Sequence, residues 1–235
     1  MVPSPLRRRV RAALVGPGWH RAVPAPLRRA LGAGLSLADT SAWLAESGVV
    51  ASHERREDLY AAVRDGLADD EPLDYLEFGV STGASLRWWS AALHHPATRL
   101  VGFDTFEGLP EDWGKVGAGA FTAGGRVPDI DDDRIDYVVG LFQDTLGPWL
   151  ETAPVGRRTI VHLDADLYSS TLFVLASLAP RLRPGDVLVF DEFGSVRNAD
   201  HEFRAFRDFT TAFGWSYEPL GATTAYKQVA LRVAR

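Results

Sequence analysis

The chain contains no cysteine and only one methionine among its 235 residues. The lack of cysteine excludes disulfides, zinc–thiolate centres and a thiol nucleophile. No apolar run approaches the roughly 20 residues that a membrane-spanning helix needs. The arginine-rich start is followed by an apolar stretch too short for a signal peptide, so we expect a cytoplasmic protein that does not enter a membrane.

Charge is unevenly distributed along the chain, whose formal net charge is −6. Residues 1–40 carry seven arginines against one aspartate, and prolines interrupt any long helix there. We interpret residues 1–70 as a basic arm followed by a helical extension, which could pack on the partner in a homodimer. Nucleic-acid binding is the weaker alternative, because the acidic remainder of the chain would repel phosphates.

From about residue 71 onward, short apolar runs alternate with segments of helical periodicity. Such alternation predicts an α/β fold with a mostly parallel sheet and helices on both faces. We therefore expect one Rossmann-like domain over residues 71–235 with a seven-stranded sheet. The expected strands are residues 74–78, 99–103, 135–139, 159–163, 186–190, 216–219 and 227–233.

The segment that precedes Gly83 has the pattern of a buried strand running into a glycine turn. Bare backbone at Gly79 and Gly83 would let a nucleotide-like ligand approach closely. The next strand ends in Asp104, whose carboxylate could accept hydrogen bonds from both ribose hydroxyls. The turn lacks the G-x-G-x-x-G pattern of nicotinamide enzymes and suits S-adenosylmethionine, which has no pyrophosphate. The cofactor contacts expected here are Glu77, Phe78, Gly79, Ser81, Gly83, Ser85, Asp104, Thr105 and Phe106.

A second cofactor segment follows the strand expected at residues 135–139. Leu141 and Phe142 could pack on an adenine ring, and Gln143 or Asp144 could bond its exocyclic amine. The simpler alternative is that Asp144 caps a helix.

Acidic residues follow two strands that should be neighbours in the sheet. Asp164 comes after one strand, and Asp191 and Glu192 come after the next. Three carboxylates at one point repel one another unless a cation lies between them, and hard oxygen ligands favour Mg²⁺. We expect these three residues, with Asp164 also near the cofactor, to hold the ion, and Asp166 to cap the next helix or orient substrate. The alternative is that some of these acids cap helices or bind backbone amides.

His201 follows the same end of the sheet and could act as a general base, because imidazole titrates near working pH. A purely structural histidine is the common alternative. The glycine-rich stretch Leu109–Arg134 is long for a connection in a compact domain, which favours a mobile substrate-binding loop.

With these residues identified, the chain resembles the macrocin O-methyltransferase family, class I methyltransferases that modify sugars on natural products. The resemblance covers roughly residues 74–215 and implies S-adenosylmethionine and Mg²⁺ as cofactors. The family's metal acids would fall on Asp164, Asp191 and Glu192, with glutamate standing where a second aspartate would be looked for. The five blocks that carry it are LEFGV at 76–80, FDTFEGLP at 103–110, GLFQDTL at 140–146, HLDADLY at 162–168 and DEF at 191–193.

The resulting hypothesis is an S-adenosylmethionine-dependent O-methyltransferase that acts on a hydroxyl of a small molecule, possibly a glycoside, with help from Mg²⁺. Asp164, Asp191 and His201 are the expected catalytic residues. One alternative is a metal-independent enzyme of the same fold with His201 as base. Another is a cofactor-binding scaffold protein without catalysis.

Overall fold

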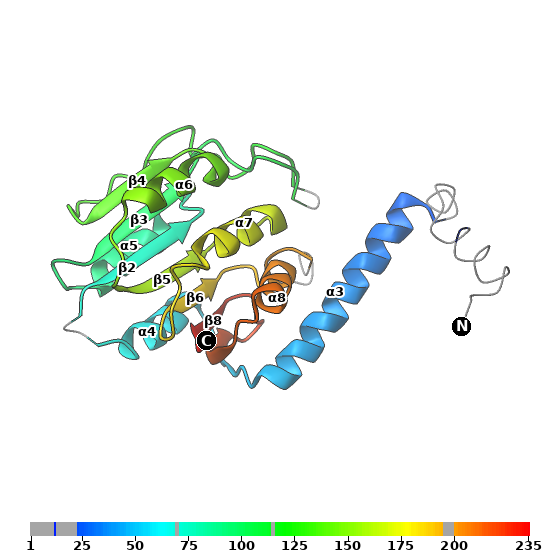
Figure 1. Ribbon diagram of the computed structural model, residues 1–235. Helices are drawn as coiled ribbons and strands as arrows, with labels where there is room; N and C mark the ends of the chain where they lie inside the picture. Colours follow the sequence, from blue (N-terminus) through cyan, green and yellow to red (C-terminus); the bar gives the residue numbers. More distant parts are fainter. Residues whose placement is uncertain (1–11, 13–22, 69–70, 114–115, 195–199) are drawn as a thin grey trace.

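One mixed sheet organises the computed structural model, which describes residues 12, 23–68, 71–113, 116–194 and 200–235. The arginines expected to form the basic arm at positions 7, 8, 9, 11 and 21 lie outside these residues. The sheet has eight strands in the order β1-β7-β8-β6-β5-β2-β3-β4 (Figure 1). The strands are β1 (Ala51–His53), β2 (Leu73–Phe78), β3 (Arg99–Asp104), β4 (Ile135–Val139), β5 (Arg158–Leu163), β6 (Val187–Phe190), β7 (Tyr217–Thr223) and β8 (Val229–Val233).

The central strands are parallel, and strand order reverses between β2 and β5. From β2 the chain builds outward through β3 to β4, then returns to the other side of β2 with β5 and β6. Strand β8 pairs antiparallel with both β6 and β7. Ligands of parallel sheets bind outside the carboxyl ends of the strands at such a reversal.

The sheet has one strand more than expected. Strand β1 is three residues long and pairs in parallel with β7 at the sheet edge, with Ala51 opposite Ala222. A run this short has no periodicity from which a strand could be recognised. The predicted domain boundary near residue 70 stays a prediction, although β1 and the helix that follows it pack on the sheet.

Helices cover both faces of the sheet, as the alternating pattern predicted. Strand β2 has apolar side chains on both faces: Leu76 and Phe78 face one apolar core, and Tyr75 faces the other. Both faces must therefore be covered. The first core includes residues of α6, α7 and α8, and the second includes residues of α4 and α5. The helices are α3 (Ala25–Ser47), α4 (Arg56–Asp65), α5 (Ala84–Ala92), α6 (Phe142–Thr152), α7 (Tyr168–Leu178) and α8 (Glu202–Phe213).

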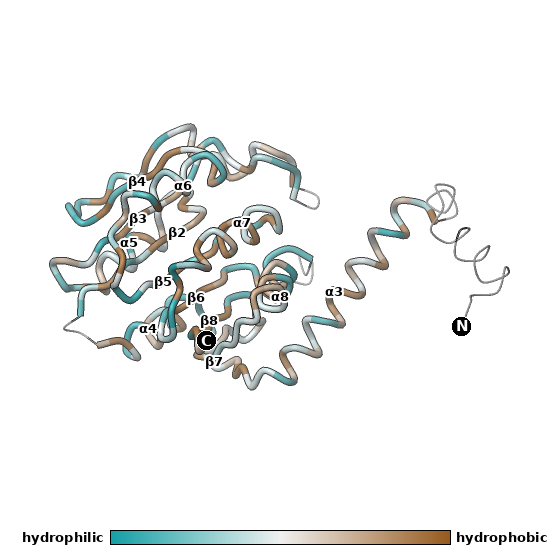
Figure 2. The backbone as a smooth tube through the Cα atoms, viewed as in Figure 1, coloured by the Kyte–Doolittle hydropathy of each residue, from teal (hydrophilic) through white to brown (hydrophobic). Residues whose placement is uncertain are grey.

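The C-terminal half of helix α3 packs on the domain. There Trp43 packs edge-on against Phe203 and Phe206 of α8, and Asp39 pairs with Arg207. The N-terminal half projects away from the sheet, with apolar and polar residues interspersed along it (Figure 2). Within the described residues, no helix combines the length and apolar character needed to cross a membrane.

Gly79, directly after β2, is where the backbone requires glycine most strictly. Its φ is +96°, and an added Cβ would lie 2.0 Å from the backbone oxygen of Asp164. We expect Gly79→Ala to lower the free energy of unfolding by about 3 kcal/mol or more. The added Cβ would clash with the backbone of Asp164, and neither segment can move without disrupting its strand.

Gly214 provides the matched control for the Gly79 prediction. Its φ is +65° and no atom lies within 4 Å of its added Cβ, so Gly214→Ala should cost only about 1 kcal/mol. Urea unfolding measures both values. Equal costs for the two variants would contradict a packing role for Gly79.

Candidate active site

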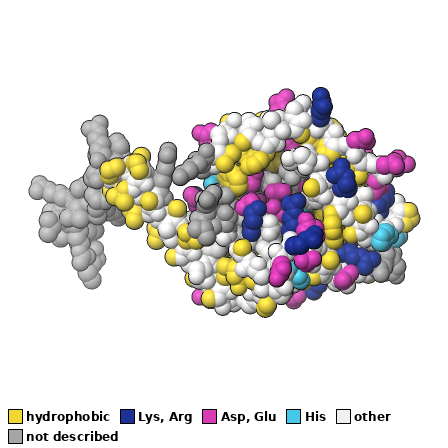
Figure 3. Space-filling model, turned by 180° about the vertical axis from the view of Figure 1, so that it is seen from behind, with side chains coloured by type: hydrophobic (Ala, Val, Ile, Leu, Met, Phe, Trp, Pro, Cys, Tyr) yellow, Lys and Arg dark blue, Asp and Glu magenta, His cyan; other side chains and the backbone are white. Residues whose placement is uncertain are grey.

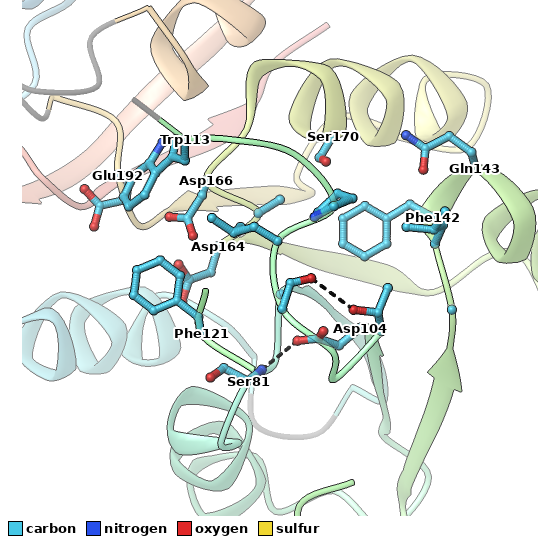
Figure 4. Close-up of a pocket in the computed structure, with 18 residues that line it drawn as sticks. Ser81, Asp104, Trp113, Phe121, Phe142, Gln143, Asp164, Asp166, Ser170 and Glu192 are labelled. Carbon is cyan, nitrogen blue, oxygen red and sulfur yellow. Dashed lines mark hydrogen bonds between the residues drawn. The ribbon is translucent and has the colours of Figure 1, made fainter. Parts of the chain in front are cut away.

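A cavity of about 240 Å³ opens at the carboxyl ends of β2 and β5, where strand order reverses. Most of the expected cofactor residues line it, and Figure 4 shows them arranged around a common space. Phe142 and Gln143 lie at one end, whereas Asp164, Asp166 and Glu192 lie toward the other. The expected residues on its wall are Gly79, Ser81, Asp104, Thr105, Leu141, Phe142, Gln143, Asp164 and Glu192.

Asp104 ends β3 and holds the turn that follows β2. One carboxylate oxygen accepts hydrogen bonds from the backbone amides of Val80 and Ser81, at 2.8 and 2.7 Å. The other accepts one from the amide of Phe106 at 2.8 Å. A carboxylate offers roughly four lone-pair positions, so one remains for a ribose hydroxyl. The expected bonding to both hydroxyls stays a prediction.

The two glycines of the turn have a different packing reason from the one expected. Gly79 lines the cavity, but the atoms nearest its missing side chain belong to the backbone of Asp164. An added Cβ at Gly83 would lie 2.8 Å from Cβ of Pro128, and Gly83 is not on the cavity wall. The protein's own chain therefore occupies the space that was expected to admit a ligand.

Several expected cofactor residues lie away from the cavity wall. Phe78 is fully buried and stacks on Phe103, with ring centroids 4.6 Å apart. Phe106 and Ser85 are also buried, the latter on α5. Glu77 is buried inside the opposite face of the sheet. Alternation of side chains along a strand places Phe78 and Glu77 on opposite faces of the sheet. Their contact with the cofactor stays a prediction.

The apolar end of the cavity is formed where α6 begins. Leu141 precedes the helix and Phe142 opens it, with the Phe142 ring edge-on to Phe78 at 5.4 Å between centroids. A half-exposed aromatic ring beside the amide of Gln143 provides an apolar face and a polar edge, which is what a purine needs. This end of the cavity therefore combines apolar and polar surface.

The carboxylate end of the cavity contains mutually repelling acids. Burial, together with repulsion from Asp191 and Asp166, raises the pKa of Asp164 well above its usual range. Burial and the nearby Glu192 raise the pKa of Asp166 to about 7. The expectation that Asp166 caps the next helix is wrong, because α7 has Leu167 as its N-cap residue and no side-chain cap.

Two cationic side chains offset part of this negative charge. Lys227 Nζ lies 2.6 Å from Glu192, and Arg56 lies 3.7 Å from Asp191. Asp191 is only 3% exposed and does not line the cavity. It also accepts a hydrogen bond from the Tyr60 hydroxyl at 3.2 Å.

The expected magnesium ligands are suitable in chemistry but do not form a ready-made site. In the part of the chain that the structure describes, no three His, Asp or Glu side chains are grouped so as to hold a metal. Asp191 faces Arg56 and Glu192 faces Lys227 instead. Burial and the neighbouring carboxylates both raise the pKa values of Asp164 and Asp166, and a hard cation at this end of the cavity would favour their ionised forms.

A row of buried polar side chains connects β2 to Asp191 on the face covered by α4 and α5. The Tyr75 hydroxyl lies 2.7 Å from Glu77 and 2.6 Å from Nδ1 of His162. Nε2 of His162 lies 3.2 Å from the Tyr60 hydroxyl, which in turn reaches Asp191. Burial raises the pKa of Glu77 to about 8 and lowers that of His162 to about 4, so both are mainly uncharged near neutral pH.

His201 lies beside the cavity but not on its wall. Its Nδ1 accepts a hydrogen bond from the backbone amide of Tyr168 at 3.3 Å, and its ring contacts Trp113. A neutral imidazole with Nδ1 engaged carries its proton on Nε2, which leaves no free lone pair for a substrate proton. Burial lowers the pKa of His201, which favours this neutral form. A catalytic role for His201 is therefore a prediction that the hydrogen bonding does not favour.

Sequence reasoning identified the glycine-rich loop but not its two aromatic residues at the cavity. Trp113 and Phe121 both line it, with ring centroids 6.0 Å apart. Their occurrence as bulky aromatic residues within a glycine-rich stretch could have indicated a binding role. The sequence analysis also did not identify Arg56 and Lys227 as partners of the acidic residues. Both lie far from those acids along the chain, so no local pattern indicated the pairings.

The sequence comparison decides the family. A model of the macrocin-O-methyltransferase (TylF) family matches residues 38–215, which is most of the chain. The chain belongs to the macrocin O-methyltransferase family. It is therefore an S-adenosylmethionine-dependent O-methyltransferase, as the five sequence blocks predicted.

Curated relatives and solved structures agree with this membership. The chain is 31% identical over 189 residues to the 8-demethyl-8-(2,3-dimethoxy-alpha-L-rhamnosyl)-tetracenomycin-C 4'-O-methyltransferase of Streptomyces olivaceus, covering 69% of each chain. It is 25% identical to the demethyldecarbamoylnovobiocin O-methyltransferase of Streptomyces niveus, covering 69% of this chain and 70% of the relative.

Among solved structures, the O-methyltransferase NovP matches with a TM-score of 0.58 at 21% identity, over 88% of this chain and 99% of that one. The calicheamicin methyltransferase CalS11 matches with a TM-score of 0.56 at 24% identity, over 99% and 94%. These two structures confirm the class I methyltransferase fold.

The buried Glu77 makes stability depend on pH. The unfolded chain releases this proton near pH 4.5, whereas the folded protein keeps it until about pH 8, so stability falls as the pH rises between these values. Glu77→Gln removes the titration. Between pH 6.5 and 8, we expect the wild type to lose on the order of 2 kcal/mol more unfolding free energy than the variant.

Urea unfolding at several pH values tests the Glu77 prediction. Glu71→Gln, at an exposed position, is the control and should leave the pH dependence of the wild type unchanged. If Glu77→Gln and wild type lose stability in parallel across this range, Glu77 is not the titrating group.

Proposed function

We propose that this enzyme methylates a sugar hydroxyl of a glycosylated small molecule, and that Mg²⁺ assists the transfer. The observation that carries the proposal is one continuous cavity. Its end at Phe142 has the apolar and polar surface that a nucleoside needs, and its end at Asp164 is rich in carboxylates. Sugars present several hydroxyl groups, and carboxylates are their natural hydrogen-bond acceptors. A rhamnosyl group in the name of the tetracenomycin relative supports the same substrate class.

The roles we assign to the residues follow from their places in the cavity. Phe142 and Gln143 would hold the adenine, while Asp104 would hold the ribose beside the glycine turn. S-adenosylmethionine supplies a methyl group carried on a positively charged sulfur. Asp164 would take up the proton that the acceptor hydroxyl gives up when the methyl group passes from the sulfur to the hydroxyl oxygen. Asp164 would take up this proton in its ionised form, which a nearby cation favours against the effect of burial.

We further propose that Asp164, Asp191 and Glu192 hold Mg²⁺, with Asp191 kept in place by Tyr60 and Arg56. A divalent ion lowers the pKa of a bound hydroxyl, which is the chemistry it would supply here. Lys227 already pairs with Glu192, so it would have to share this carboxylate with the ion or move away from it.

Calorimetric titration of S-adenosylhomocysteine, with Mg²⁺ and with EDTA, tests the cofactor assignment. We expect micromolar binding in both conditions, because the nucleoside end does not include the proposed metal ligands Asp191 and Glu192. Asp104→Ala should weaken this binding at least tenfold, since it removes the ribose acceptor and loosens the turn. Undiminished affinity in Asp104→Ala would show that the nucleoside lies elsewhere.

Thermal unfolding with increasing Mg²⁺ tests the metal assignment. We expect Mg²⁺ to raise the Tm of the wild type and to leave Asp191→Ala unshifted, because the ion binds only the folded protein. Asp191→Ala should also lose turnover while still binding S-adenosylhomocysteine. Turnover that survives EDTA would favour the metal-independent mechanism, and binding without turnover on a panel of glycosides would favour a scaffold.

We also propose that α3 packs against a second copy of this chain. Leu27, Leu31 and Leu35 are 51%, 56% and 68% exposed and share one face of the projecting half of the helix. Seen from behind, apolar side chains gather on this projecting segment (Figure 3). The arginine-rich residues 1–40 complement the acidic remainder of another copy, which favours a homodimer over other partners.

Light scattering coupled to size-exclusion chromatography tests this contact. We expect a dimer for the wild type and a monomer for Leu31→Glu, because a buried charge would oppose the packing. Val155→Glu, at an exposed apolar residue away from α3, should leave the dimer intact. A monomeric wild type would overturn the proposal.

A further inference from the structure

The carboxylate end of the cavity has an aromatic wall to which no role has yet been assigned. Trp113 and Phe121 come from the glycine-rich loop, and in Figure 4 Trp113 lies near Glu192 and Asp166 whereas Phe121 lies near Asp164. Trp113 is only 8% exposed and lies deep, whereas Phe121 is 56% exposed and lies at the mouth. The two rings meet edge to face, with centroids 6.0 Å apart.

Described residues of the loop that carries these rings make contacts with α7, with the start of α8 and with each other. Glu111 accepts a hydrogen bond from Ser169 of α7 at 2.5 Å, and Trp113 contacts the ring of His201 at the start of α8. The backbone amide of Leu109 bonds to the oxygen of Ala120 at 3.0 Å, which brings the two halves of the loop together. The loop is thus braced from both sides, and its aromatic rings are held at the cavity.

Backbone strain is concentrated around the same cavity. Of the five non-glycine residues described with positive φ, Ser81, Phe121 and Asp166 line it. Phe121 has φ of +61°, a conformation that costs a bulky residue about 1–2 kcal/mol. An exposed aromatic residue kept in a strained conformation gains little from burial, so a binding role is the reason that its position suggests.

We propose that Trp113 and Phe121 form the acceptor subsite and select glycosides with a flat aromatic aglycone. A sugar ring has an apolar face of C–H groups and an edge of hydroxyls. Its face would lie on Trp113, its hydroxyls would bond to Asp166 and Glu192, and its aglycone would stack on Phe121 at the mouth. This inference rests on the proposed function, because it concerns the acceptor of the same reaction.

Phe121→Gly separates a binding role from a structural one. Glycine accepts the positive φ without strain, so this variant should unfold at the same Tm as the wild type or higher. Its affinity for S-adenosylhomocysteine should be unchanged, since Phe121 lies at the acceptor end. Phe213→Ala, at an exposed aromatic residue of α8 outside the cavity, is the control.

The probes are 4-nitrophenyl α-L-rhamnopyranoside and methyl α-L-rhamnopyranoside, titrated into protein saturated with S-adenosylhomocysteine. We expect the aryl glycoside to bind the wild type and Phe213→Ala at least tenfold more tightly than the methyl glycoside. In Phe121→Gly this preference should disappear.

Three outcomes would overturn the proposal: equal affinity for both glycosides, binding of neither, or a preference that survives in Phe121→Gly. In each case, intact binding of S-adenosylhomocysteine would leave the proposed methyltransferase function standing. Failure of S-adenosylhomocysteine to bind would instead reject the cofactor site itself.

Discussion

The close approach of the turn after β2 to the end of β5 is the constraint on which the site depends. Because Gly79 has no side chain, its backbone lies directly against that of Asp164. The same turn is held from its other side by Asp104, through amides of Val80 and Ser81. The turn after β2 and the acidic end of β5 are thereby joined into one cavity. Any side chain at Gly79 would push them apart.

Negative charge at this cavity is balanced by several means together. Lys227 and Arg56 each pair with one acid, whereas burial and neighbouring carboxylates raise the pKa values of Asp164 and Asp166. A site with part of its charge unbalanced is costly to the folded state and responsive to cations and protons. The carboxylate end of the cavity is therefore expected to be chemically active, while backbone hydrogen bonds to Asp104 fix the turn beside it.

The sheet and the strand ends could be predicted from sequence because their signals are local. Apolar runs followed by Asp104, Asp164 or Asp191 identify both the strands and the edge at which they end. Glu77 shows a limit of this reasoning. It was expected to contact the cofactor together with Phe78, but strand alternation places its side chain with Tyr75 on the opposite face. Pairings of distant residues, such as Glu192 with Lys227, depend on how β8 returns beside β6, and no local pattern encodes that return.

The buried row from Glu77 to Asp191 has a consequence for how the sheet assembles. Glu77 pairs with His162 in the register of β2 and β5, and Tyr60 meets the row from α4. A slip of one residue in either strand would turn these polar groups into the opposite apolar core, where they would have no partners. Apolar side chains alone would tolerate such a slip more readily. The row therefore favours a single register of the central strands. That register in turn determines the geometry of the cavity at their carboxyl ends.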